Sequence, residues 1–236
     1  MSFLFPLFRA CCALALVGLA GLAQAAAPTV PDTMAQRMLA CTLCHGAEGR
    51  STNSGYFPRI AGKPAGYLYN QLVHFRDGRR QNAAMAALLQ TLSDDYLRDI
   101  AAYFAALDLP YPPPQRHPVA TAVMERGEAL VRQGDPQRQV PACTACHGET
   151  LTGVNPGIPG LLGLPRDYLL GQLGAWQTGL RHAAAPDCMA EIARALPASD
   201  VSAVATWLAS QPLPERTQPA ATMAQPLPLR CGSGLP

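Results

Sequence analysis

Two short stretches of the chain hold the same chemistry-bearing residues at the same spacing. One reads CTLCHG and the other CTACHG, and their reactive residues are Cys41, Cys44 and His45, then Cys143, Cys146 and His147. On a helical turn, positions i, i+3 and i+4 face the same way, so two thiols and an imidazole can converge on one flat ligand. This pattern is typical of covalent haem c attachment, in which the histidine binds the iron.

Zinc binding and thiol redox chemistry are the alternatives for these stretches. A zinc module with four cysteine ligands places its two pairs roughly 15–20 residues apart, whereas here a whole repeat separates them. A redox dithiol would begin a helix within a βαβ unit, and the sequence shows no such unit. Neither alternative uses the histidine. We therefore predict two covalently bound haem c groups, attached to Cys41 and Cys44 and to Cys143 and Cys146, with His45 and His147 as iron ligands.

The two stretches belong to a duplicated unit. When they are superposed, FPRIAGKPAGYLYNQLVHFRDGRR from Phe57 aligns with IPGLLGLPRDYLLGQLGAWQTGLR from Ile158. Prolines, glycines and aromatic residues recur in register, and after a short insertion Met85 aligns with Met189. Two long copies indicate a duplicated domain rather than a solenoid.

The second axial ligand decides whether a haem iron carries electrons or reacts with small molecules. The candidates are Met85, Met189, His74, His117 and His182. Only the two methionines match across the repeat, so we predict that they bind the irons and raise the reduction potential. The alternative for each methionine is a core-filling role. The histidines at 74 and 182 are expected at the surface or beside haem propionates, and His117 lies in a linker.

A proline follows each motif histidine at nearly the same spacing: Pro58 follows His45, and Pro159 follows His147. The free ring nitrogen of a metal-binding histidine usually has a hydrogen-bond partner. In c-type cytochromes a proline carbonyl at this spacing takes that role. The alternative is two unrelated loop prolines, but the recurrence favours a functional pair.

Each copy predicts the same order of helices, and strand signals are almost absent. The expected helices cover residues 33–44, 65–75 and 93–107 in the first copy, and 123–133, 166–176 and 198–210 in the second. Ser93 in the first copy, and Ser199 or Asp200 in the second, are expected to cap the last helix. The fold class is therefore all-α, with two tandem domains.

The expected organisation begins with a secretory signal peptide over residues 1–25, which has an apolar stretch and ends in the A-x-A sequence Ala23-Gln24-Ala25. An uncleaved membrane anchor is the alternative. A first domain over 26–109, a proline-rich linker over 110–118, a second domain over 119–211 and a proline-rich tail over 212–236 follow. Export predicts a periplasmic protein in an oxidising compartment.

Composition excludes some functions. The formal net charge is +2 at pH 7, so there is no strong basic field for nucleic acid. No apolar run after the signal peptide approaches the roughly 20 residues that span a bilayer. Membrane contact is therefore expected only through protein partners.

The quoted stretches resemble the dihaem cytochromes c4. The similarity covers CTLCHGAEGRS, the aligned segments from Phe57 and Ile158, the region of Met85, and nearly all of the expected mature chain to about Gln211. This resemblance implies two class I cytochrome c domains that carry electrons in the periplasm, from a cytochrome bc complex towards a terminal oxidase. It also implies that Arg80 and Arg181 neutralise haem propionates, although solvated surface arginines are the alternative.

Two cysteines depart from the family pattern. Cys188 precedes Met189, and Cys231 lies in the tail. In an oxidising compartment a remaining pair favours a disulfide, which would strap the tail over the methionine side of the second haem. The alternative is a free thiol near the iron.

The favoured function is an electron carrier without substrate turnover, whose partners are redox proteins. One alternative is the electron-accepting subunit of a periplasmic dehydrogenase. A dihaem peroxidase is a further alternative, but it needs an open or displaceable iron site, and matching methionines argue against that. A sulfur-oxidation cytochrome with a cysteine-ligated haem is the remaining alternative, and only Cys188 supports it.

Overall fold

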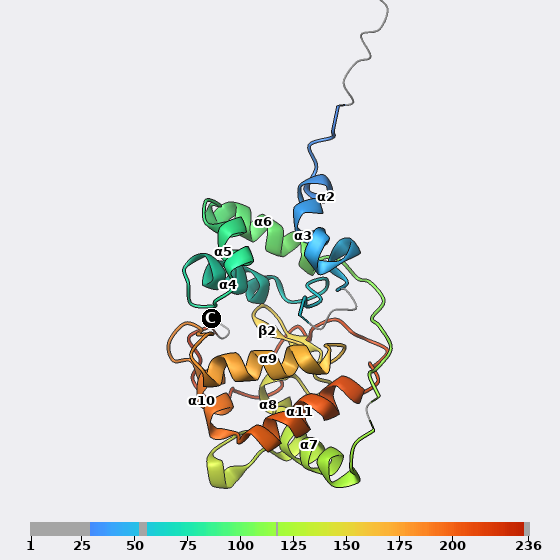
Figure 1. Cartoon of the computed structure of the whole chain (residues 1–236), viewed down its shortest axis with the longest axis vertical. Coiled ribbons are helices and arrows are strands. Elements are labelled where there is room, and N and C mark those ends of the chain that lie inside the picture. Colours follow the sequence, from blue (N-terminus) through green and yellow to red (C-terminus); the bar gives the residue numbers. More distant parts are fainter. Residues whose placement is uncertain (1–28, 52–55, 117, 234–236) are drawn as a thin grey trace, which may run out of the picture. The chain divides into compact units, whose positions relative to one another are not determined.

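The computed structural model describes residues 29–51, 56–116 and 118–233 (Figure 1). The expected signal peptide and His117 lie outside these residues. The described residues from Arg37 onward form one compact unit, which contains both copies of the repeat. Within the described residues, no helix is long and apolar enough to cross a membrane.

The first copy consists of short helices around a small core. After α2 (Met34–Arg37), its elements are α3 (Leu39–His45), the 3₁₀ turn η1 (Ala47–Gly49), α4 (Ala65–Arg76), α5 (Ala83–Leu89) and α6 (Asp94–Ala105). Helix α4 packs against both α5 and α6. Ser93 caps α6 as predicted, because its Oγ accepts a hydrogen bond from the Tyr96 amide at 3.3 Å. The core residues include Met38, Leu97 and Phe104.

The second copy repeats this order and adds a hairpin. Its elements are α7 (Thr121–Gln133), η2 (Pro136–Arg138), α8 (Thr144–His147), β1 (Gly153–Val154), β2 (Ile158–Pro159), α9 (Arg166–Gln177), α10 (Cys188–Ala195) and α11 (Ala198–Ser210). The two strands pair antiparallel. Helix α11 packs against α7 and α9 around a larger apolar core (Figure 1). The predicted helix-dominated fold is confirmed, and the hairpin is the part that the sequence did not indicate.

The helix before the second cysteine motif ends at Gln133, as predicted, because Gly134 has φ 76° and a Cβ there would meet the Val140 carbonyl. The expected side-chain cap of α11, in contrast, is absent. Pro197 stands at its N-cap, and Asp200 instead accepts two hydrogen bonds from Arg126 of α7, at 2.9 and 2.7 Å.

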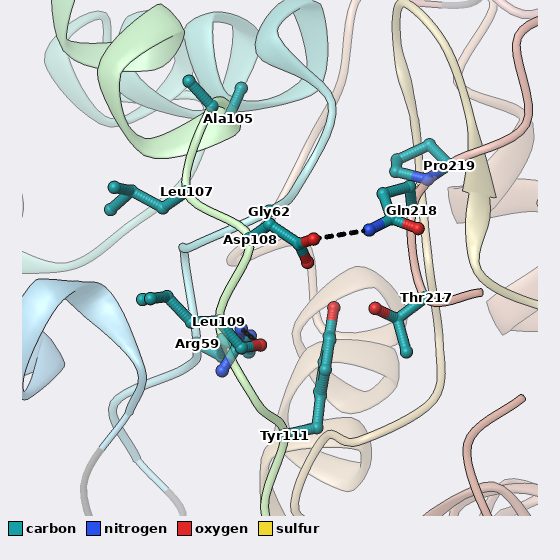
Figure 2. A pocket seen from close by; sticks show the side chains of 11 residues that line it. Arg59, Gly62, Ala105, Leu107, Asp108, Leu109, Tyr111, Thr217, Gln218 and Pro219 are labelled. Carbon is teal, nitrogen blue, oxygen red and sulfur yellow. Dashed lines mark hydrogen bonds between the residues drawn. The ribbon is translucent and has the colours of Figure 1, made fainter. Parts of the chain in front are cut away.

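The linker is attached to the first copy by one buried arginine. The Arg59 guanidinium donates to the carbonyls of Leu109, at 2.6 Å, and Pro110, at 2.9 Å. It also lies 3.9 Å from the centroid of the Tyr111 ring. Arg59, Leu109 and Tyr111 line one side of a small pocket, where the linker and tail meet the first copy (Figure 2). The linker is therefore held in place rather than free.

The proline-rich tail has no helix over 212–233 but is bound along the second copy. Ala220 exchanges two backbone hydrogen bonds with the hairpin, from its amide to Gly153 and from Asn155 to its carbonyl. Gln218 donates to Asp108 at 2.8 Å (Figure 2). The tail thus joins the hairpin to the end of the first copy.

Candidate functional site

The two cysteine motifs occupy equivalent places in the two copies. Helix α3 carries the first motif and ends at His45, and α8 carries the second and ends at His147. A glycine with positive φ follows each histidine, Gly46 at 75° and Gly148 at 86°. A Cβ on Gly46 would meet the Ser51 carbonyl, so only glycine allows this reversal. Both imidazoles are consequently buried where the helix ends.

Each motif histidine is paired with the proline that follows it. His45 Nδ1 lies 2.9 Å from the Pro58 carbonyl oxygen, and His147 Nδ1 lies 2.7 Å from that of Pro159. Since a carbonyl can only accept, each Nδ1 is the protonated nitrogen and each Nε2 keeps a free lone pair. Burial lowers the pKa of both rings, which outweighs the opposing effect of the carbonyls. Two neutral, oriented imidazoles are therefore available to bind metal.

The four motif cysteines are free thiols, although two other cysteines of the chain are paired. Burial raises the pKa of Cys41 and Cys146, and raises that of Cys143 to about 12. A redox or zinc-binding cysteine needs a stabilised thiolate, which is the opposite shift. Among the described residues, no three His, Cys, Asp or Glu side chains are grouped to hold a metal ion. The raised pKa values of these three thiols thus disfavour both alternatives to haem.

Each of the two methionines lies in the first turn of a short helix. Met85 is in α5, where the Asn82 side chain accepts a hydrogen bond from its amide at 3.1 Å. Met189 is in α10, where Asp187 caps the helix through the Ala190 amide. Both thioethers are half-buried, and Met189 packs on the cluster around Trp176. The caps fix the two backbones at equivalent points of the repeat.

Two buried polar rings are unlike anything expected from the sequence. The Trp176 indole Nε1 is buried without a hydrogen-bond partner among the described residues. His74 is 3% exposed rather than at the surface, and burial together with nearby arginines lowers its pKa to about 4. An unsatisfied indole N–H beside Met189 is costly unless an acceptor completes the site. A haem propionate would supply such an acceptor.

Arg80 and Arg181 are buried at the junction of the two copies, not solvated at the surface. The backbones of these two arginines form an isolated antiparallel β-bridge. Both donate to the same two amide oxygens, Gln71 and Gln172, at 2.6–3.0 Å. Neither guanidinium pairs with a carboxylate within the part of the chain that the structure describes.

Two uncompensated buried cations imply an anionic partner. Burial raises the pKa of the nearby Tyr67 hydroxyl, but Arg181 and Arg80 outweigh this and lower it below its usual value. Burial, reinforced by Arg80, also lowers the pKa of Arg181. The local field is therefore strongly positive, and the chemistry of the donors suits carboxylate groups such as haem propionates.

The tail is covalently attached beside Met189. Cys188 and Cys231 form a disulfide, with their Cα atoms 5.3 Å apart. Gly232 donates to the Pro186 carbonyl at 2.8 Å, and Ser233 Oγ accepts from the Ala184 amide at 3.0 Å. The end of the described tail thus holds the loop that leads into α10.

Lys63 is a buried cation at the junction of the two copies that the sequence did not indicate as a site residue. Lys63 is 5% exposed, and its amine donates to the carbonyl of Gly160 in the other copy at 3.1 Å. The available signal was compositional, because Lys63 is the only lysine in a chain with 18 basic residues.

No protein-family model matches the chain. Curated relatives nevertheless cover most of it. A protein named thiosulfate dehydrogenase electron acceptor, from Thiomonas intermedia, is 38% identical over 173 residues, which are 73% of this chain and 79% of that protein. A cytochrome c4 from Pseudomonas aeruginosa is 35% identical over 197 residues, which are 81% of this chain and 92% of that protein.

Two solved structures are similar to this chain. Reduced cytochrome c4 from Pseudomonas stutzeri has 30% identity and a TM-score of 0.64, over 74% of this chain and 94% of that one. The thiosulfate dehydrogenase TsdBA from Marichromatium purpuratum has 35% identity and a TM-score of 0.65 over 73% of this chain. The matched region is 36% of the TsdBA chain, so the similarity concerns only part of that protein.

Proposed function

The chain belongs to the cytochrome c4 family of dihaem electron-transfer cytochromes with covalently bound haem c, and we propose that its two cysteine motifs hold the haem groups. The supporting observation is the recurrence of one geometry: in both copies a buried histidine with a proline carbonyl on Nδ1 follows two free thiols. The thioether attachments are Cys41 and Cys44 for the first haem and Cys143 and Cys146 for the second.

In this proposal each iron has a histidine and a methionine ligand: His45 with Met85, and His147 with Met189. Pro58 and Pro159 orient the imidazoles and keep Nδ1 protonated. Haem c supplies one-electron exchange between ferrous and ferric iron. The protein fixes the ligands, covers them with apolar side chains, and places Arg80 and Arg181 where propionate charge needs compensation.

Two ligands from the chain leave no open iron position, so we propose an electron carrier rather than an enzyme. A peroxidase would need one displaceable ligand. Cyanide titration of the ferric protein tests this directly. We expect no haem to bind cyanide at low concentration, and rapid stoichiometric binding to one haem would instead indicate an enzyme.

The proposed location is the periplasm, and the proposed path runs from a cytochrome bc complex towards a terminal oxidase. One observation favours a second partner. The relatives from Thiomonas intermedia and Stutzerimonas stutzeri, each 38% identical, are named electron acceptors of thiosulfate dehydrogenase. The second candidate function is therefore acceptance of electrons from such a dehydrogenase.

Stopped-flow reduction separates the two candidates. The oxidised protein is mixed either with a reduced cytochrome bc complex or with a thiosulfate dehydrogenase and thiosulfate. Fast reduction only in the first mixture supports the respiratory path, and fast reduction only in the second supports the dehydrogenase path. If neither reduces the protein faster than a non-cognate c-type cytochrome, both partner assignments are wrong.

A further inference from the structure

Lys63 is a cation of the first copy that lies against the second motif. It precedes Pro64, the N-cap of α4, and its side chain is buried. Its Nζ donates to the Gly160 carbonyl at 3.1 Å, across the junction between the copies. No carboxylate of the described residues forms an ion pair with it, so its charge is uncompensated at this position.

The contact of Lys63 is one residue away from the support of the second histidine. Gly160 directly follows Pro159, whose carbonyl holds His147 Nδ1 at 2.7 Å. The turn is tight, because a Cβ on Gly160 would lie 2.5 Å from the Thr152 carbonyl oxygen. A tight turn can shift little without moving both carbonyls. Binding of the amine to Gly160 therefore also restrains the Pro159 carbonyl.

This arrangement has no counterpart at the first motif. In the register of the repeat, Leu164 occupies the position of Lys63, and it is a buried apolar residue. Gly160 itself aligns with Arg59, whose guanidinium is turned to the linker carbonyls. The two copies therefore differ at this position: the first copy places a charged amine against the second motif, and the second copy places none against the first.

We propose that Lys63 is a positioning residue of the second haem centre: it holds the Pro159–Gly160 turn against His147 and places a positive charge beside that centre alone. This inference rests on the proposed haem assignment. A buried positive charge favours the ferrous over the ferric state, because reduction removes one positive charge from the iron. Lys63 therefore raises the reduction potential of the second haem relative to the first.

The surroundings of Lys63 add a dependence on pH. The charged or titratable groups near it are Arg59 on its own segment, Tyr111 in the linker, whose ring centroid is 6.0 Å from Nζ, and His147 on α8. Burial, reinforced by Arg59, lowers the pKa of Lys63 to about 7. Its charge is thus present below neutral pH and lost above it, so the gap between the two potentials should narrow as the pH rises through 7.

The test compares Lys63→Met and Lys63→Arg in the loaded protein, with the exposed Arg116→Gln as a control of equal net charge. Spectroelectrochemistry gives the potentials of both haems, which are assigned with a Met189→His variant. We expect Lys63→Met to lower the reduction potential of the second haem by about 59 mV, which corresponds to a tenfold fall in its reduced-to-oxidised ratio at a fixed potential. The reduction potential of the first haem should not change. Lys63→Arg should restore most of this ratio. Equal shifts of both haems, or none, would overturn the proposal.

A second measurement needs no variant. Because Lys63 is the only lysine of the chain, ¹⁵N-lysine labelling gives one side-chain ammonium signal in the native protein. We expect this signal to titrate near neutral pH and to shift when the second haem is reduced. A lysine signal that does not respond to reduction of the second haem would contradict the proposal. Intact mass separates the two claims: a wild-type protein without haem refutes the haem assignment and the inference that rests on it, whereas two attached haems with unchanged potentials in Lys63→Met refute the role of Lys63 alone.

Discussion

At the residue scale, each centre depends on a histidine that is kept neutral and correctly oriented. His45 and His147 are buried, and the Nδ1–H of each donates a hydrogen bond to a proline carbonyl. These conditions leave Nε2 free to bind the iron in the proposed site. Burial raises the pKa of the thiols of Cys41, Cys143 and Cys146, which disfavours their thiolate forms.

The two proposed distal ligands can be tested separately. Met85→Ala and Met189→Ala should each abolish half of the far-red absorption band that is typical of methionine-ligated ferric haem. Each should also lower one potential by roughly 0.1–0.2 V, because axial ligands set potentials over a range of about 0.8 V.

Met124→Leu is the matched control for the methionine variants, since Met124 packs against the apolar core of the second copy. Its spectrum and potentials should equal those of the wild type. If either alanine variant keeps the full far-red band, another residue is the ligand at that site.

At the element scale, short helices hold the proposed ligands, and side-chain caps and covalent links fix those helices. Asn82 caps α5, Asp187 caps α10, and the disulfide between Cys188 and Cys231 ties the first residue of α10 to the tail. The second distal loop therefore has a restraint that the first lacks among the described residues. Removal of this restraint should affect one centre only.

The double variant Cys188→Ser/Cys231→Ser tests the disulfide. The link closes a loop with a sequence separation of 43, so its loss should reduce the free energy of unfolding by about 4 kcal/mol on the chain-entropy account. Thermal melting should show that the far-red band of the second haem disappears at a lower temperature than that of the first. Thiol counting in the denatured wild type, without reductant, provides the control. Equal loss of both bands would contradict a local role.

The junction between α7 and α11 predicts a pH dependence of stability. Hydrogen bonds from Arg126 lower the pKa of the Asp200 carboxyl below its usual 3.8. Because this pKa is lowered on folding, the ionised Asp200 carboxylate stabilises the folded state. That stabilisation is complete above the unfolded-state pKa and is lost as the pH falls through the folded-state pKa. Asp200→Asn should lower the free energy of unfolding by about 1–2 kcal/mol at pH 7 and should make this free energy fall less steeply at acid pH. Guanidinium unfolding from pH 7 to pH 2 measures both effects. If the variant loses stability at acid pH as steeply as the wild type, Asp200 is not linked to acid stability.

The sequence predicted the histidine–proline pairs of both motifs but not the burial of His74. The pairs could be identified because both members of each pair recur in register in the two copies. The position that corresponds to His74 in the second copy is Ala175, so the repeat gives no indication that the His74 side chain is buried. Asp200 matched a capping pattern, but an arginine 74 residues away takes its carboxylate. Contacts between distant residues with no counterpart in the other copy leave no local signal.

At the scale of the whole molecule, the two copies share their charges. Arg80 donates to Gln172, and Arg181 donates to Gln71, so each guanidinium is bound by the other copy as well as by its own. Two cations held together in a buried position are stable only with anions nearby. The junction therefore couples the electrostatics of both centres.

Arg181→Gln should lower the reduction potentials, because propionate charge would lose its compensation. We expect the reduction potential of at least one haem to fall by about 59 mV, which corresponds to a tenfold fall in its reduced-to-oxidised ratio. The neighbouring Arg79 is exposed, so Arg79→Gln is the matched control and should shift neither potential by a comparable amount. Equal shifts in the two variants would mean that the buried position of Arg181 has no special role.

The central claim is that each copy holds one covalently attached haem through its own cysteine motif. Intact-mass measurement of the protein from a host with cytochrome maturation tests it most directly. We expect a chain that carries two haem masses, and a Cys143→Ser/Cys146→Ser variant that carries one. A bare polypeptide from the same host, or two attached haems in that variant, would contradict it.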